Sequence, residues 1–209
     1  MTTLQFTLAL SSASTVIMVI LMLLAGIVRR WTPGKLQSYI PLLAPLIVLL
    51  PVAGLPVYTY IRGAIGDLSI VSQGLILAIV IQRLSQKQLV DDASKQQLPV
   101  IISIMGILLY PAALGLGPVD TYSFGYQGAL LPLLALLITV WLFYVRALLA
   151  SGLLAFAVLV AAVGAMESSN LWDYLLDPWV SFYAWGWVVY SGIQRWRRRP
   201  KPAPQQSST

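Results

Sequence analysis

The chain alternates between long apolar segments and short polar connections. A helix needs about 20 consecutive apolar residues to cross the hydrocarbon core of a bilayer, and runs near this length recur along the sequence. Their spacing predicts a series of membrane-spanning helices joined by short loops. The predicted spans cover residues 8–28, 39–58, 67–82, 98–116, 129–145, 148–166 and 179–194.

The fifth and sixth predicted spans nearly touch in the sequence. Residues 129–166 as one helix would extend over about 57 Å at 1.5 Å per residue, which is too long for one crossing. Arg146 lies between the two apolar runs, and the Ser151-Gly152 pair lies near the start of the second. We therefore predict a helical hairpin here.

The second predicted span, residues 39–58, contains four prolines, at positions 41, 45, 51 and 56. Proline removes a backbone donor and kinks or breaks a helix, so a re-entrant segment is the alternative to a full span. The distribution of Lys and Arg favours the full span. If residues 39–58 cross the membrane, only Arg62 of the 13 basic residues lies on the side opposite the others. If they do not, Arg62 is joined there by Arg29, Arg30 and Lys35.

Basic residues concentrate on the cytoplasmic side of membrane proteins, so the sequence predicts seven spans, an external N-terminus and a cytoplasmic C-terminus. The first apolar segment has no basic residue before it, whereas a cleavable signal peptide begins with a positive region. We expect that segment to be retained as a helix. The predicted fold is an all-α polytopic bundle over residues 1–196, followed by a basic and then disordered tail over 197–209.

Composition supports this class of fold. Hydrophobic residues make up 58% of the chain and charged residues 10%, whereas soluble domains carry about 25% charged residues. The chain has no Cys and no His, which excludes disulfides, thiolate nucleophiles, imidazole catalysis and most zinc and haem sites. We predict no cofactor and no metal site. The net charge of +6 is gathered on one predicted side, so the expected partners are the lipid bilayer and other membrane subunits rather than nucleic acid.

The first candidate site lies in the connection before the third predicted span. Arg62 is the lone external cation, and Asp67 follows it closely. Ser69 and Gln73 recur at i and i+4 on one helix face, which is predicted to point into the bundle. The Gly66-Asp67 pair is predicted to cap this span. Arg62 then forms either a structural ion pair with an external carboxylate or, with the helix N-terminus, a site for an anion or lipid headgroup.

The second candidate site is an acidic, Trp-rich connection before the last span. Asn170 is predicted to cap a short helix over 171–176, and Asp177-Pro178 has the pattern of an N-cap followed by the first helical residue. The aromatic residues suit either an interfacial belt or helix packing. The alternative is an external lip that binds a partner or a cationic ligand. The residues of this lip are Glu167, Asn170, Trp172, Asp173, Asp177 and Trp179.

No enzymatic signature stands out. The stretch "AIGDL" has Ala64 where the GxGD motif of intramembrane aspartyl proteases needs its first glycine. We therefore predict no catalytic residues and favour a non-catalytic accessory or scaffold subunit of a bacterial cytoplasmic membrane, for instance in envelope biogenesis or secretion. One alternative is a small transporter or lipid-handling protein with an outward-facing site around Arg62 and Asp67. The other is a membrane enzyme that uses carboxylates, such as Asp120 and Glu167.

Overall fold

The computed structural model describes residues 14–17, 19–21, 23–24, 44–85, 87–116, 118–126 and 128–198. The described chain is mostly helical, in agreement with the all-α prediction. Its elements are α2 (Ala44–Leu49), β1 (Pro51–Val52), β2 (Leu55–Pro56), α3 (Val57–Ile65), α4 (Ile70–Ser85), α5 (Asp92–Ala113), the 3-10 helix η3 (Tyr122–Gly125), α6 (Leu130–Tyr144), α7 (Leu148–Ala162), α8 (Leu171–Leu175) and α9 (Pro178–Arg197).

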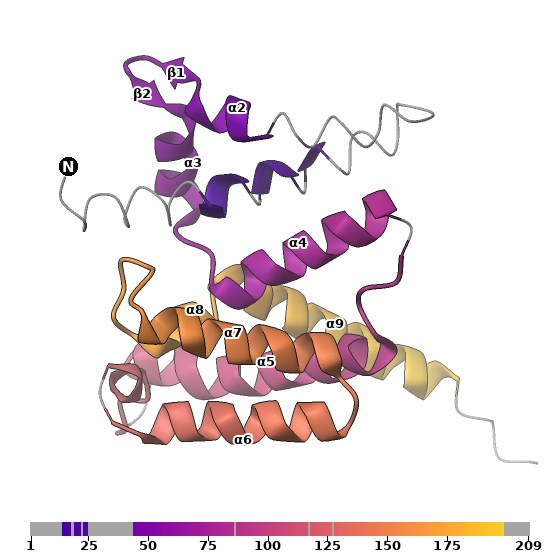
Figure 1. Ribbon diagram of the computed structural model, residues 1–209. Helices are drawn as coiled ribbons and strands as arrows, with labels where there is room; N and C mark the ends of the chain where they lie inside the picture. The colour runs from indigo at the N-terminus through magenta and orange to yellow at the C-terminus, as the bar shows by residue number, and fades with distance from the viewer. Residues whose placement is uncertain are drawn as a thin grey trace, which may run out of the picture.

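The main bundle is built around α7. This helix contacts α4, α5, α6 and α8, while α9 packs along α5. Figure 1 shows α5, α6, α7 and α9 running alongside one another, with α4 crossing above them. Small buried residues such as Ala150, Ala157 and Ala184 allow the helices to approach closely, and Leu142 and Tyr174 fill the core between them.

A smaller core joins the N-terminal elements. Val16 and Ile20 from the described part of the first predicted span pack against Val48 of α2, with α3 residues at the margin. This unit is tied to the bundle by hydrogen bonds: the Leu68 amide donates to Thr15 Oγ1 over 3.2 Å, and Trp179 Nε1 of α9 donates to the Ile65 carbonyl over 3.0 Å. The rest of the predicted span 8–28 lies outside the described residues.

The predicted continuous helix over 39–58 is wrong in its described part. Helix α2 stops at Leu49, and a two-stranded antiparallel hairpin follows, in which Val52 pairs with Leu55. The turn between them places Ala53 and Gly54 at positive φ, which is incompatible with an α-helix. Prolines at 51 and 56 supply no backbone N–H for a continuous helix, so the hairpin and the restart at α3 take its place.

The third predicted span begins later than expected. Gly66, at φ +73°, ends α3 and donates its amide to the Arg62 carbonyl over 2.8 Å. The side chain of Asp67 is bound to Arg62 and does not cap a helix. Instead, the Ser69 hydroxyl accepts the Ser72 amide over 3.2 Å, so α4 starts at Ile70 and runs to Ser85.

Other predicted elements agree more closely with the structure. Helices α6 and α7 form the expected hairpin, with Arg146 in the left-handed region at φ 62° in the connection. Asn170 caps α8, and Asp177 caps α9, whose first residue is Pro178. Helix α9 extends to Arg197, the first residue of the predicted tail; beyond Arg198 the tail lies outside the described residues.

Fewer of the described helices are long enough to span a bilayer than the sequence predicts. Among the helices of the described residues, only α5, with 22 residues, is by itself long and apolar enough to cross a bilayer. Helices α3 and α4 meet the same requirement when taken together, but they are bent by 118° at their junction. Helices α6 and α7 are apolar and have 15 residues each, which corresponds to about 22 Å.

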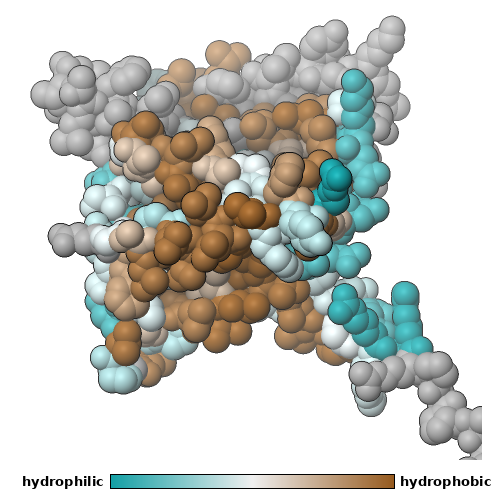
Figure 2. Space-filling model, turned by 60° about the horizontal axis from the view of Figure 1, so that its bottom comes forward, coloured by the Kyte–Doolittle hydropathy of each residue, from teal (hydrophilic) through white to brown (hydrophobic). Residues whose placement is uncertain are grey.

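The surface of the bundle is strongly apolar between two polar edges. Figure 2 shows one face on which hydrophobic residues form a broad central area, with hydrophilic residues gathered along two opposite edges. Helix α6 contributes many exposed apolar side chains; Leu136, for example, is 57% exposed. The same exposure continues at Ile107 of α5, Leu159 of α7 and Val189 of α9.

Candidate functional site

Charged residues are separated between the two ends of the bundle. The Leu149 amide donates to the Asp91 carboxylate over 3.0 Å, which joins the α4–α5 connection to the α6–α7 connection at one end. Figure 1 shows the C-terminal end of α9 at this same end. The described cations here are Arg83, Lys87, Lys95, Arg146, Arg195, Arg197 and Arg198, while Arg62, Asp67, Asp120, Glu167, Asp173 and Asp177 lie at the opposite end, called the acidic end below.

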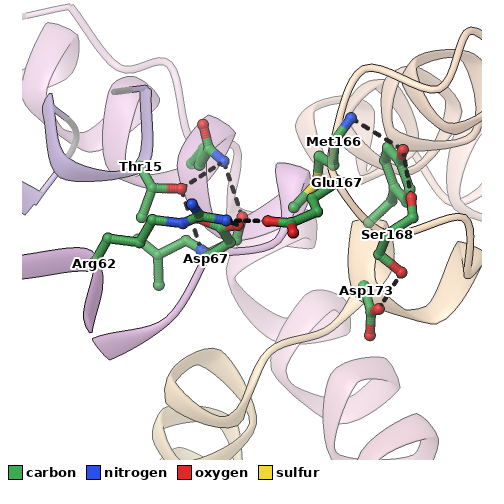
Figure 3. Close-up of polar contacts among 10 residues, drawn as sticks. Thr15, Arg62, Asp67, Met166, Glu167, Ser168 and Asp173 are labelled. Carbon is green, nitrogen blue, oxygen red and sulfur yellow. Dashed lines mark hydrogen bonds and ion pairs between the residues drawn. The ribbon is translucent and has the colours of Figure 1, made fainter. Parts of the chain in front are cut away.

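At the acidic end, Arg62 bridges two carboxylates. Its Nε and Nη2 donate to the two oxygens of Asp67, each over 3.0 Å, and Nη2 also contacts Glu167. Figure 3 shows Arg62 between these partners, with Glu167 reaching it from the connection after α7. The hydrogen bond to Asp67 is the main reason that the pKa of Arg62 lies above its ordinary value; partial burial opposes this shift, and Glu167 adds to it. This arrangement favours the structural ion pair over an anion site.

Asp177 provides the anion at two helix N-termini. Its side chain is buried, with the residue 3% exposed. Oδ1 caps α9 by accepting the Val180 amide over 3.0 Å. Oδ2 accepts the Ser69 amide over 3.0 Å and the Ser69 hydroxyl over 2.8 Å, and it also contacts the Ser72 hydroxyl. Because a helix N-terminus attracts negative charge, this carboxylate occupies the position in front of α4 that a headgroup anion would need.

Ser69 and Gln73 point into the bundle, as predicted, and both are buried. Gln73 Nε2 donates to the Leu68 carbonyl over 2.9 Å, and Gln73 Oε1 accepts the Ser14 hydroxyl over 3.0 Å. These contacts attach the first helical segment to α4. The two polar residues therefore hold elements of the fold together. Binding of a ligand by Ser69 and Gln73 remains a prediction.

Half of the predicted acidic and aromatic lip is internal. Asn170 is fully buried: Oδ1 accepts the Trp172 amide over 2.9 Å, and Nδ2 donates to the Tyr122 carbonyl over 3.0 Å. Trp172 is also buried, and Nε1 donates to the Thr121 carbonyl over 2.9 Å. Gly125 permits this packing, because a Cβ there would lie 1.7 Å from Asn170 Oδ1. These residues hold η3 against α8.

Asp173 accepts hydrogen bonds from two hydroxyl groups. Tyr122 donates to Asp173 Oδ2 over 3.0 Å, and Ser168 contacts the same oxygen, as Figure 3 shows for Ser168. Burial raises the pKa of Tyr122 well above its ordinary value, and hydrogen bonds with Tyr126 and Asp173 add to the shift. Tyr122 therefore stays protonated and keeps donating to Asp173.

The remaining lip residues are exposed. The Glu167 side chain is 57% exposed, and only one of its oxygens contacts Arg62. Trp179 is also exposed, although its indole N–H is bonded to the Ile65 carbonyl. Binding of a partner by these two residues remains a prediction. Asp120 accepts the amides of Tyr122 and Ser123. It does not line the cavity at this end of the bundle.

A cavity of about 460 Å³, called the acidic cavity, lies among the residues of the acidic end. Its mouth includes the exposed Glu167, and its apolar wall comes from the outer turn of α5 and from Leu176. The charged and hydroxyl residues that line it are Asp67, Glu167, Asp173, Asp177, Tyr110 and Tyr122. Sequence reasoning identified the four carboxylates but missed Tyr110 and Tyr122, since only the tertiary fold brings them to the same cavity.

The lining determines which charge the cavity favours. Four carboxylates line the cavity, and the one guanidinium beside it, that of Arg62, is bonded to Asp67 and Glu167, so the site has an excess of negative charge and favours a cationic group. Among the residues that the structure describes, no three His, Cys, Asp or Glu side chains are grouped so that they could hold a metal ion.

No protein-family model matches the chain, and comparisons with curated proteins and with solved structures found no similar protein.

Proposed function

We propose that the chain is a multi-pass protein of a bacterial cytoplasmic membrane, with its acidic end outside, that binds a positively charged small molecule or lipid headgroup in the cavity at that end. The sequence predicted an anion or headgroup site at Arg62 and, as a separate alternative, a cationic ligand at the acidic lip; the proposal keeps the transporter or lipid-handling role but takes its ligand from the second. The observation that carries it is the cavity lined by Asp67, Glu167, Asp173 and Asp177.

The membrane location is supported by the apolar surface. Soluble monomers rarely expose contiguous apolar patches larger than a few hundred Å². Here, exposed apolar residues follow one another along α6, including Leu133, Leu136, Leu137 and Val140, each more than half exposed. A bilayer is the solvent in which such a surface is stable. The 15-residue helices α6 and α7 would be accommodated by local thinning of the bilayer.

The orientation is supported by the segregation of charge. Lys and Arg gather at the end of the bundle that carries the α4–α5 and α6–α7 connections, and the positive-inside rule assigns that end to the cytoplasm. The acidic end and its cavity then face the outside. Seven spans remain our proposal for the complete chain, with residues 39–58 crossing as a broken segment.

Electrostatics supports the ligand class. A unit positive charge about 4 Å from one carboxylate gains about 4 kcal/mol at an effective dielectric constant near 20. Arg62 already neutralises part of the cavity through Asp67 and Glu167, which leaves Asp173 and the second oxygen of Glu167 as the most accessible acceptors. A cationic ligand is expected to bind against these two carboxylates.

An accessory or scaffold subunit, the role that the sequence alone favours, is the second candidate. The observation that favours it is the exposed apolar face of α6, which could pack against a helix of another membrane subunit. Purification in mild detergent distinguishes this candidate: a stoichiometric partner supports it, and a monomer that binds cations by itself favours the cavity.

Thermal unfolding with propylamine tests the proposed function. We expect propylamine to raise the melting temperature of the purified chain, and the combined Glu167→Gln and Asp173→Asn variant to lose this response. Asp120→Asn is the control, because it removes a carboxylate at the same end that does not line the cavity and keeps a side-chain oxygen that can accept the Tyr122 amide. An equal response in the combined variant, or no response in the wild type, contradicts the proposal.

A further inference from the structure

A second hollow adjoins the acidic cavity on the side of α9. This groove has a volume of about 540 Å³ and lies between α5 and α9. Its lining is apolar and includes Ile107, Leu114, Trp185 and Val189. Tyr110 lines both the groove and the acidic cavity, so the two hollows meet at this side chain.

The groove runs along the bundle from the acidic end towards its middle. Leu114 lies just past the outer end of α5, and Ser103 lies eleven residues earlier on the same helix. At 1.5 Å per residue, these positions are about 16 Å apart along the axis. The groove therefore begins beside the polar edge and continues into the apolar surface, the depth range of an alkyl chain in the outer leaflet.

The wall of the groove is fixed by packing between aromatic rings. The indole of Trp185 donates to the Ser103 carbonyl over 3.1 Å and packs edge-to-face against Tyr110, with ring centroids 6.0 Å apart. Phe182 packs edge-to-face against the other side, at 5.5 Å. Gly106 allows this close approach, because a Cβ there would lie 3.1 Å from the Trp185 ring.

One residue with a polar side chain, Ser103, lies at the inner end of the groove. The residue is 5% exposed, and its hydroxyl oxygen is the buried side-chain polar atom that has no hydrogen-bond partner within the described part of the chain. A buried polar group without a partner costs about 1–3 kcal/mol. Because this oxygen is itself buried, a ligand lying in the groove does not contact it.

We infer that the ligand of the acidic cavity is an amphiphile with an amine or other cationic headgroup, whose alkyl chain lies in the α5–α9 groove. This inference rests on the proposed function and narrows it. A small soluble cation would use only the acidic cavity, and an uncharged lipid would use only the groove. The two hollows share Tyr110 as a lining residue, so the proposed ligand would pass along this side chain from one hollow to the other.

Quenching of Trp185 fluorescence tests this inference in the full chain, reconstituted in phosphatidylcholine nanodiscs. The probe is dodecylamine brominated on its chain, and the control probe is the equally brominated dodecanol, which has the same tail without the charge. Bromine quenches tryptophan at short range, so the part of the quenching that Trp185→Phe removes reports occupation of the groove. We expect the quenching that depends on Trp185 to reach half-saturation at a concentration about tenfold lower for the amine than for the alcohol.

Two sets of variants assign the effect to the two hollows. Glu167→Gln combined with Asp173→Asn should abolish the preference for the amine, whereas Asp120→Asn should retain it. Val189→Phe should block the groove without adding a tryptophan, while Val140→Phe adds the same bulk to the exposed face of α6 and should have no effect. Melting temperatures of all variants establish that they are folded.

The outcomes separate this inference from the proposed function. If the amine and the alcohol quench Trp185 equally, or if Val189→Phe changes nothing, the amphiphile is excluded as the ligand. If propylamine still stabilises the chain in that case, the cavity binds small cations and the proposed function stands. If neither propylamine nor the brominated amine acts, both proposals are overturned.

Discussion

At the scale of single residues, several polar groups of the acidic end make hydrogen bonds that stabilise the fold. Asp177 and Asn170 are buried caps, and their roles follow from local sequence patterns that can be recognised in advance. The predicted cap at Asp67 failed because Arg62, five residues earlier, binds both of its oxygens. The contact between Asp177 and Ser69 spans 108 residues, and no local pattern predicts it.

Replacing Asp177 should show how strongly one carboxylate supports two helices. Asp177→Ala removes the acceptor of the Val180 and Ser69 amides and of two serine hydroxyls, so the unfolding free energy should fall by about 2–4 kcal/mol. Asp177→Asn retains a capping oxygen and should lose less. Urea unfolding in mild detergent measures both changes. An alanine variant as stable as the wild type would show that these hydrogen bonds contribute nothing net.

At the scale of elements, the sequence predicted helices well where an apolar run was uninterrupted. Helices α6, α7 and α9 fall close to their predicted positions, whereas α5 begins six residues before its predicted span and continues through Pro99 and Pro111. The segment 39–58 differs because its prolines and the turn at Ala53 and Gly54 stabilise a hairpin that hydropathy alone cannot distinguish from a helix.

The hydrogen bond between the Asp91 carboxylate, at the start of α5, and the Leu149 amide of α7 should make the stability of the fold decrease at acid pH. Burial alone would raise the pKa of Asp91, but hydrogen bonds from the Leu149 amide and from Ser94 outweigh it, so the pKa lies below its ordinary value. A carboxylate whose pKa is lower in the folded state stabilises that state above the unfolded pKa and loses this effect as the pH falls through the folded pKa. Asp91→Asn should therefore be less stable than the wild type at pH 7, and the difference should shrink below about pH 4. A difference independent of pH would contradict this role.

At the scale of the whole molecule, the sequence predicted the separation of charge but not the hollows. The positions of the described Lys and Arg residues between apolar runs were sufficient to predict that all of them except Arg62 lie at one end. The acidic cavity combines residues from the α3–α4 connection, α5, η3, the α7–α8 connection and α8, and its shape depends on how these segments pack. The adjoining groove depends in the same way on the approach of α9 to α5 at Gly106.

The central claim is that the acidic end and the basic end lie on opposite sides of a membrane, with the acidic end outside. The chain contains no cysteine, so single cysteines introduced by Ser169→Cys at the acidic end and Lys87→Cys at the basic end can each be labelled unambiguously. In intact cells, a membrane-impermeant thiol reagent should label the cysteine at position 169 and should label that at position 87 only after the membrane is permeabilised. Labelling of both positions from the same side would contradict the orientation and, with it, the external binding site.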